Sequence, residues 1–264
     1  MPLAEFTNTH SAALGADEAK HNLILGILER LAVGMSPLPR TWTLGGPGAC
    51  AVQMEGRPIV LGDLDRSQCH SLAEAVRDTN FPGVIGADSC PLWFVERASE
   101  LGQLFSTPVP QRIYSLRDPP HYPRSPGLLR QASLDDATLL LSWMGAFSSE
   151  TKTEGPAILL NTTALRAGDY CLWTENDRPV AMAYINRRSR NTATISGVYT
   201  PPEFRRRGFG GSVTAGVAAR IFQEGKSAAC LYTDLRNPYS NRCYAKIGFK
   251  PVCDSAYFSR LMPT

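Results

Sequence analysis

Residues 117–127 restrict the fold of this chain more than any other stretch. They include Pro119, Pro120, Pro123 and Pro126. Because proline has no backbone N–H and a fixed φ angle, a stretch this rich in proline is typical of a linker rather than of a packed helix or strand. The 264-residue chain therefore divides into two lengths of ordinary domain size, and we expect domains at 1–120 and 127–264.

The first length alternates helix and strand patterns. Leu23, Ile27 and Leu31 recur at helical spacing and predict a helix over 17–33. Further helices are expected at 67–79 and 91–102, strands at 41–44, 50–54, 59–61 and 111–116, and a turn with a short apolar segment at 81–86.

The second part of the chain, 127–264, also alternates helix and strand patterns, with more strands than the first. Ser133, followed by Asp135 and Asp136, marks the start of a helix. Strands are expected at 128–132, 170–174, 180–186, 193–199, 228–235, 249–253 and 257–261, and further helices at 156–166, 211–224 and 239–247. This order predicts the α/β class, with a mixed sheet that is covered by helices.

Composition argues against several classes of protein. A net charge of +3 gives no dominant positive field, so no nucleic-acid partner is expected, and the arginines at 187–190 and 205–207 are placed in loops. The seven cysteines show no C-x-x-C pair and no metal-ligand spacing to histidine, so we expect no metal and a reduced, cytoplasmic protein. No secretory signal and no apolar run of the ~20 residues that span a bilayer is visible, so no membrane association is expected.

The segment 197–212 is the most informative about chemistry. It lies between an apolar strand pattern and an amphipathic helix pattern. Gly208, Gly210 and Gly211 allow the backbone to approach a ligand, and the first amides of the following helix favour a phosphate group. Glycine-rich turns also occur in plain strand-to-helix connections, so this segment alone does not identify an anion site.

A second segment, 237–249, follows after one further helix and one further strand. It contains Asn237, Ser240, Tyr244 and the dipeptide Gly248-Phe249. Together the two segments resemble the GCN5-related N-acetyltransferases (GNAT). Arg205-x-x-Gly208-x-Gly210 is similar to the acyl-CoA pyrophosphate loop of that family, and 237–249 is similar to its asparagine, tyrosine and Gly-Phe motif. The resemblance covers about residues 127–264.

The resemblance implies a GNAT acyl-CoA N-acyltransferase fold for the C-terminal domain, with acetyl-CoA or another acyl-CoA as cosubstrate. Backbone groups of Val198 and Thr200 would bind the pantetheine arm, and Asn237 would contact the same arm. The implied cofactor-binding residues are Val198, Tyr199, Thr200, Arg205, Arg206, Arg207, Gly208, Phe209, Gly210, Gly211, Ser212, Asn237, Ser240 and Tyr244.

Tyr244 resembles the catalytic general acid of the family. A phenol with a reference pKa of ~10 stays protonated at neutral pH and is able to protonate the departing CoA thiolate. The alternative is a buried aromatic residue that anchors its helix. The implied reaction is direct attack of an amine on the thioester, with the oxyanion stabilised by backbone amides such as that of Val198.

Several points stay open at this level. The general base is not identified, and Glu150, Glu154, Tyr199, Glu203 or a water relay would each serve. The acceptor is a small-molecule amine or a peptide amine, and the oligomeric state is unknown. The alternative function is a non-catalytic acyl-CoA sensor or partner-binding protein.

The first length lacks both motifs. Its order of helices and strands resembles the degenerate GNAT-like lobe of two-domain members of the superfamily, so it is not expected to bind CoA.

Overall fold

The computed structural model describes residues 2–32, 39–151 and 160–261. Contacts between Cα atoms divide the chain into two compact units. The first unit comprises Met1–Tyr114, Tyr232–Asn237 and Pro251–Thr264, and the second comprises Ser115–Leu231 and Pro238–Lys250. The expected domains, 1–120 and 127–264, are continuous along the chain, whereas the first compact unit also takes two later segments. The domain boundaries therefore stay a prediction.

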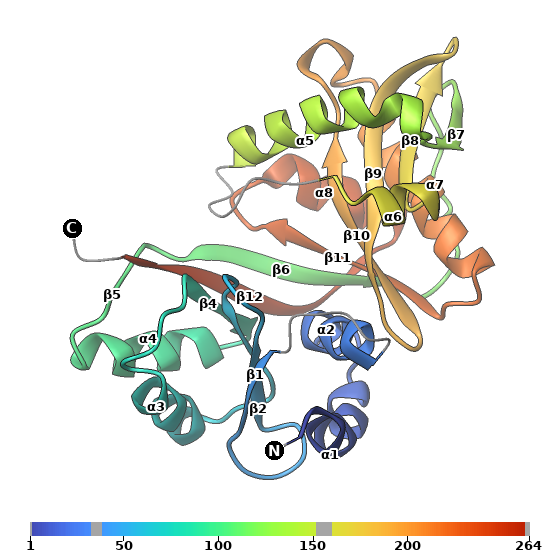
Figure 1. The fold of residues 1–264 in the computed structure, drawn as a ribbon. Helices are drawn as coiled ribbons and strands as arrows, with labels where there is room; N and C mark the ends of the chain where they lie inside the picture. Colours follow the sequence, from blue (N-terminus) through green and yellow to red (C-terminus); the bar gives the residue numbers. More distant parts are fainter. Residues whose placement is uncertain (1, 33–38, 152–159, 262–264) are drawn as a thin grey trace. The chain divides into compact units, whose positions relative to one another are not determined.

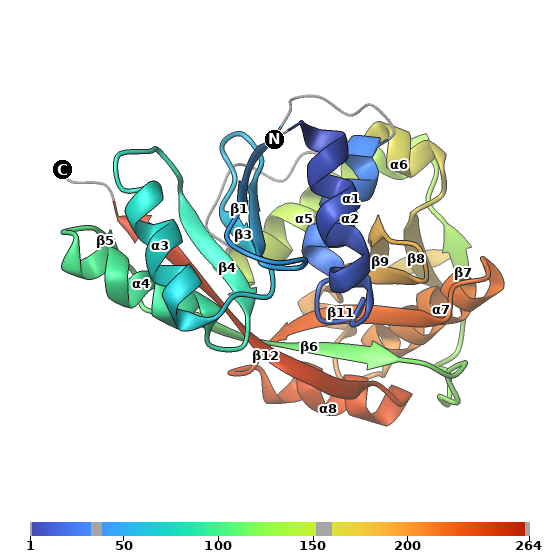
Figure 2. The same ribbon diagram turned by 90° about the horizontal axis from the view of Figure 1, so that it is seen from below.

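The first unit contains a mixed sheet with helices on both faces (Figures 1 and 2). Its strands are β1 (Arg40–Thr43), β2 (Cys50–Gln53), β3 (Ile59–Leu61), β4 (Gly83–Ala87), β5 (Leu104–Phe105) and most of β6 (Val109–Leu116) and β12 (Lys250–Leu261). Its helices are α1 (Leu3–Gly15), α2 (Asn22–Ala32), α3 (Arg66–Ala75) and α4 (Cys90–Glu100). The strand order is β1-β2-β3-β4-β12, where β3 and β4 are parallel and the other neighbours antiparallel.

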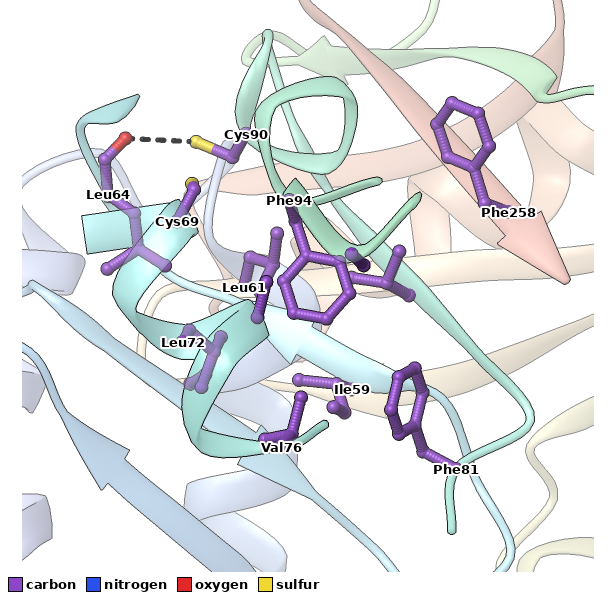
Figure 3. Close-up of a cluster of buried hydrophobic side chains, with 14 of the residues drawn as sticks. Ile59, Leu61, Leu64, Cys69, Leu72, Val76, Phe81, Cys90, Phe94 and Phe258 are labelled. Carbon is purple, nitrogen blue, oxygen red and sulfur yellow. Dashed lines mark hydrogen bonds between the residues drawn. The ribbon is translucent and has the colours of Figure 1, made fainter. Parts of the chain in front are cut away.

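Alternation along β2 explains why both faces of this sheet are covered. Cys50 and Val52 pack with the apolar side chains of α1 and α2, whereas Ala51, between them, packs with those of α3 and α4. Figure 3 shows the second cluster, in which the rings of Phe81 and Phe94 meet edge to face with centroids 6.0 Å apart. Side chains of alternate residues on one short strand therefore belong to two cores.

The second unit also has a mixed sheet. Its strands are β7 (Leu128–Gln131), β8 (Tyr170–Glu175), β9 (Arg178–Arg188), β10 (Thr192–Tyr199) and the first part of β11 (Ala228–Asp234). Its helices are α5 (Ala137–Thr151), α6 (Thr162–Arg166), α7 (Phe209–Gln223) and α8 (Pro238–Ile247), with short 3-10 turns at Leu134–Asp136 and Pro202–Phe204. The order is β7-β8-β9-β10-β11, and β10 and β11 are the parallel pair. The predicted mixed α/β class is confirmed.

Alternation along β8 divides the second unit in the same way. Tyr170 and Leu172 pack in the cluster that α5 and α6 cover. Cys171 points to the opposite face, where its Sγ lies 3.6 Å from Nη1 of Arg220 on α7. Figure 1 shows α5 and α7 on opposite sides of these strands. Helix α7 therefore covers one face of the sheet along its length, and its first turn is fixed beside the end of β10.

Several element boundaries differ from the sequence prediction. The predicted helix over 17–33 begins only at Asn22, and α1 lies before it, where the sequence gives no helix. Helix α1 buries Phe6, His10 and Leu14, and the polar residue His10 in this apolar row hides the helical pattern. Residues 83–87 form the strand β4 rather than a turn, and β12 is one continuous strand where two were expected. The part of the predicted helix 156–166 before residue 160 is outside the described residues.

Candidate active site

The end of β10 departs from regular strand geometry. Its parallel register with β11 pairs Thr192–Ile195 with Ala228–Leu231, and its register with β9 shifts between Ser196 and Tyr199. Gly197 has a φ of 59°, and a Cβ at this position would overlap the ring of Tyr184. Glycine is required here because both the dihedral angle and the contact exclude a side chain. The last residues of β10 therefore leave the regular ladder.

The residues after Gly197 are the ones expected to bind the pantetheine arm. Val198 and Thr200 are half-buried, and Tyr199 between them is 7% exposed. The ring of Tyr199 packs 6.2 Å from that of Trp143, and its hydroxyl donates to Glu150 Oε1 at 3.3 Å. Tyr199 thus packs in the core under α5, and the backbone on either side of it stays partly accessible.

The turn that leads into α7 leaves three backbone amides without a partner in the helix. Arg206 and Gly208 have φ angles of 63° and 81°, both in the left-handed region. Gly208 is the N-cap residue and no side chain caps the helix, while the first intrahelical donor is the amide of Ser212, which bonds Gly208 O at 3.0 Å. The amides of Phe209, Gly210 and Gly211 therefore have no partner within the helix. Alternating left-handed residues before an uncapped helix make a concavity that favours an anion.

The corresponding strand-to-helix turn in the first unit is capped instead. Asp65 precedes α3, and its Oδ1 accepts from the amide of Gln68 at 2.8 Å in a capping box. A carboxylate occupies the place that an anionic ligand would take at this helix start.

The three arginines of the turn have different surroundings. Arg205 makes two hydrogen bonds of 2.8 and 2.7 Å to the carboxylate of Glu150, and Arg207 pairs with Glu175 at 2.7 Å. Arg206 is exposed and makes no ion pair with any residue that the structure describes. The resemblance implies that all three bind the cofactor, but carboxylates partner two of them, so Arg206 is the arginine that remains available.

Helix α8 positions Tyr244. Its side chain is 7% exposed, and its ring meets that of Phe249 edge to face with centroids 6.1 Å apart. Burial raises the pKa of the phenol above its usual range, while a hydrogen bond with Ser240 acts in the opposite direction with a smaller effect. Tyr244 is therefore a protonated phenol at neutral pH, and its burial also suits an anchoring role.

The remaining predicted residues are not all brought together. Ser240 lies one turn before Tyr244 on α8, as expected. Asn237 belongs to the segment Tyr232–Asn237, which clusters with the first unit, and its amide donates to Asp234 O at 3.0 Å. Cys243 is half-buried, and burial raises the pKa of its thiol, which opposes a nucleophilic role.

The residues that could act as the general base have different surroundings. Glu150 lies near the end of α5 and is held by Arg205 and Tyr199, whereas Glu203 is exposed in the turn before Arg205. Burial raises the pKa of Tyr199, and the charge of Glu150 adds to this shift. Glu154 lies outside the described residues.

Two contacts at this turn could not be read from the sequence. Tyr122 and Ser125, from the proline-rich stretch, lie directly against the start of α7. A proline-rich composition indicates a linker but does not show what the linker touches, so these residues were not predicted. Within residues 2–32, 39–151 and 160–261, no group of three or more metal-ligating side chains occurs, and no helix is both long and apolar enough to cross a bilayer.

Comparison with known proteins identifies the fold. A GCN5-related N-acetyltransferase from Kribbella flavida is 15% identical, with a TM-score of 0.62 and coverage of 91% of this chain and 96% of that one. One from Sphaerobacter thermophilus is 16% identical, with a TM-score of 0.60 and 94% of each chain covered. A tandem GNAT protein from the clavulanic acid biosynthesis pathway is 11% identical, with a TM-score of 0.54 and coverage of 91% and 88%. These similarities confirm that the chain has the GNAT fold.

A protein-family model also matches part of the chain. Residues 176–259 match the model described as FR47-like protein, and this span includes β10, the turn, α7 and α8. No curated protein matches the chain. The predicted GNAT resemblance is thus confirmed, and the FR47-like match falls on the segments that carried it.

Proposed function

We propose that this protein transfers an acetyl or another short acyl group from CoA to a primary amine in a ternary complex. The observation that carries the proposal is the uncapped start of α7 behind Arg206 and Gly208, in a chain with the GNAT fold. The amides of Phe209, Gly210 and Gly211 would hold the diphosphate of the cosubstrate, and the guanidinium of Arg206 would add charge.

The other proposed roles follow from this placement of the diphosphate. The backbone of Val198 and Thr200, where β10 leaves its ladder, would hydrogen-bond the pantetheine arm as an added strand does. The amine nitrogen would attack the thioester carbon, and the C–S bond would then break. Tyr244 would give its phenolic proton to the departing thiolate, and a base would take a proton from the amine.

The general base stays open among Glu150, Glu154, Tyr199, Glu203 and a water relay. Glu150 lies beside Tyr199, but Arg205 holds both of its oxygens. Glu150 would therefore accept a proton only after this ion pair opens. A water relay needs no such opening.

We further propose that the first unit is a GNAT-like lobe that does not bind CoA. The similarity to a protein described as a tandem GNAT protein supports two such lobes, and the Asp65 cap on α3 supports the loss of anion binding. The chain would then carry one CoA site.

Replacement of Tyr244 tests the catalytic proposal. We expect Tyr244→Phe to lower kcat at least about a hundredfold, because general acid catalysis contributes about 10²–10⁴-fold, and to leave the Kd for acetyl-CoA within about twofold. Thiol release from acetyl-CoA with an amine panel and calorimetric titration give the two values. Tyr239→Phe is the matched control, since Tyr239 lies on the same helix and is 79% exposed.

The outcomes separate the possible functions. Unchanged turnover in Tyr244→Phe would reject the acid role. The burial of Tyr244 favours the alternative of a CoA-binding sensor, which predicts that the wild-type protein binds CoA but releases no thiol with any amine. A wild-type protein that retains no CoA in native mass spectrometry and shows no binding by calorimetry would refute both.

A further inference from the structure

The proline-rich stretch holds the start of α7 by two hydrogen bonds. Ser125 Oγ donates to the carbonyl oxygen of Arg207 at 2.7 Å, and the Ser125 amide donates to Ser212 Oγ at 2.8 Å. Ser212 is fully buried. One bond therefore fixes the chain just before Gly208, and the other fixes the first turn of the helix.

This contact explains why glycine occupies two positions of the turn. A Cβ on Gly208 would lie 2.6 Å from Ser125 Oγ, and a Cβ on Gly211 would overlap the Tyr122 hydroxyl and lie 2.5 Å from its Cζ. Gly210 is different, since a Cβ there would lie 3.3 Å from Thr200 Oγ1. Two of the three glycines thus make room for the chain's own linker.

The bond from Ser125 Oγ has a consequence for the next amide. The peptide between Arg207 and Gly208 is planar and trans, so its carbonyl and its N–H point in opposite directions. Fixing the Arg207 carbonyl toward Ser125 therefore aims the Gly208 N–H away from Ser125. Glycine tolerates φ angles of either sign, so without this bond the peptide would be able to rotate and turn its carbonyl toward the ligand.

We propose that Ser125 is a positioning residue for the diphosphate site, and that residues 122–125 act as a clasp that fixes the amides of the turn. This inference rests on the proposed CoA binding. The clasp contacts the turn on the side where the Arg207 carbonyl, Gly208 and Gly211 lie. It therefore acts by orienting the amides and does not need to contact the ligand.

The test is the substitution Ser125→Ala, measured with two thioesters. The variant loses the bond to Arg207 but keeps its amide for Ser212. We expect its Kd for acetyl-CoA, measured by calorimetry, to rise about five- to tenfold, which corresponds to the loss of one hydrogen bond between a misoriented amide of the turn and the diphosphate. Its Kd for acetyl-pantetheine, measured by NMR titration, should change less than about twofold, because that thioester has no diphosphate. Ser125→Thr keeps a hydroxyl and should restore acetyl-CoA binding to within about twofold of wild type.

A matched control separates the clasp from a general loss of stability. Ser227 Oγ donates to the carbonyl of Asn191 at 3.1 Å, in the same unit and in an exposed loop. Ser227→Ala should leave both Kd values unchanged. Equal weakening of both thioesters in Ser125→Ala, or an unchanged Kd for acetyl-CoA, would overturn the clasp. If the wild-type protein binds no acetyl-CoA, the proposed function fails as well, whereas wild-type binding with an unaffected variant overturns the clasp alone.

Discussion

The contact between Gly211 and Tyr122 predicts an unusual response to alanine. In most helices a glycine-to-alanine change is favourable by up to about 1 kcal/mol, because alanine restricts the unfolded chain and suits helical geometry. Gly211 is the third residue of α7, and an added methyl group would lie 2.5 Å from Tyr122 Cζ. Displacing a packed group typically costs about 1–3 kcal/mol. We therefore expect Gly211→Ala to lower the free energy of unfolding by about 1 kcal/mol, or the melting temperature by about 2–4 °C.

A matched control and a double mutant make the reasoning testable. Gly145 lies in α5 and is exposed, and a Cβ there would meet no described atom within 4 Å apart from its chain neighbours and its own helix backbone, so Gly145→Ala should stabilise the protein by up to about 1 kcal/mol. In a Tyr122→Ala background the clash is absent, and Gly211→Ala should become neutral or stabilising. Urea unfolding followed by circular dichroism and tryptophan fluorescence gives the free energies of the wild type, the three single variants and the double variant. If Gly211→Ala stabilises the wild-type protein as much as Gly145→Ala does, the argument is wrong.

Two further predictions concern charged groups of the second unit. Arg206 has a left-handed φ angle of 63°, which is unfavourable for a residue with a side chain, so Arg206→Gly should raise the free energy of unfolding by up to about 1 kcal/mol. The same substitution should weaken acetyl-CoA binding about five- to tenfold, because it removes the guanidinium. A joint loss of stability and affinity would contradict this. Asp136 pairs with Arg130 at 2.7 Å, and this partner, together with hydrogen bonds from Ser133, lowers the pKa of the carboxyl below its usual range. The stabilisation by this pair is present above the pKa of the unfolded chain and is lost as the pH falls through the lower folded-state pKa, so Asp136→Asn should cost about 1 kcal/mol at neutral pH and progressively less on acidification. Urea unfolding across a pH series measures this difference, and a gap that stays constant to about pH 3 would refute the role of the pair.

Local patterns in the sequence predicted much of the second unit. Ser133 marks the start of a helical segment, as expected, and its side chain forms a capping box with Asp136, whereas helix α7 begins at Phe209, two residues before the expected start at 211. Such features depend on residues only a few positions apart, so spacing alone reveals them. The order of strands and helices likewise predicted the mixed sheet.

The roles of the arginines could not be predicted in the same way. Glu150 and Glu175 come from α5 and from the end of β8, and only the folded chain brings them to Arg205 and Arg207. The sequence shows three adjacent positive charges but not which of them the protein neutralises.

The sequence by itself determined the alternation of helices and strands and the two motifs that indicate the GNAT fold, because these depend on the spacing of residues that are close together in the chain. The tertiary structure alone decided that β12 continues as one strand and pairs with β4, and that Ser125 and Tyr122 lie against the start of α7. These contacts join residues far apart in the chain, where pairing depends on the shape of the packed elements rather than on any local propensity.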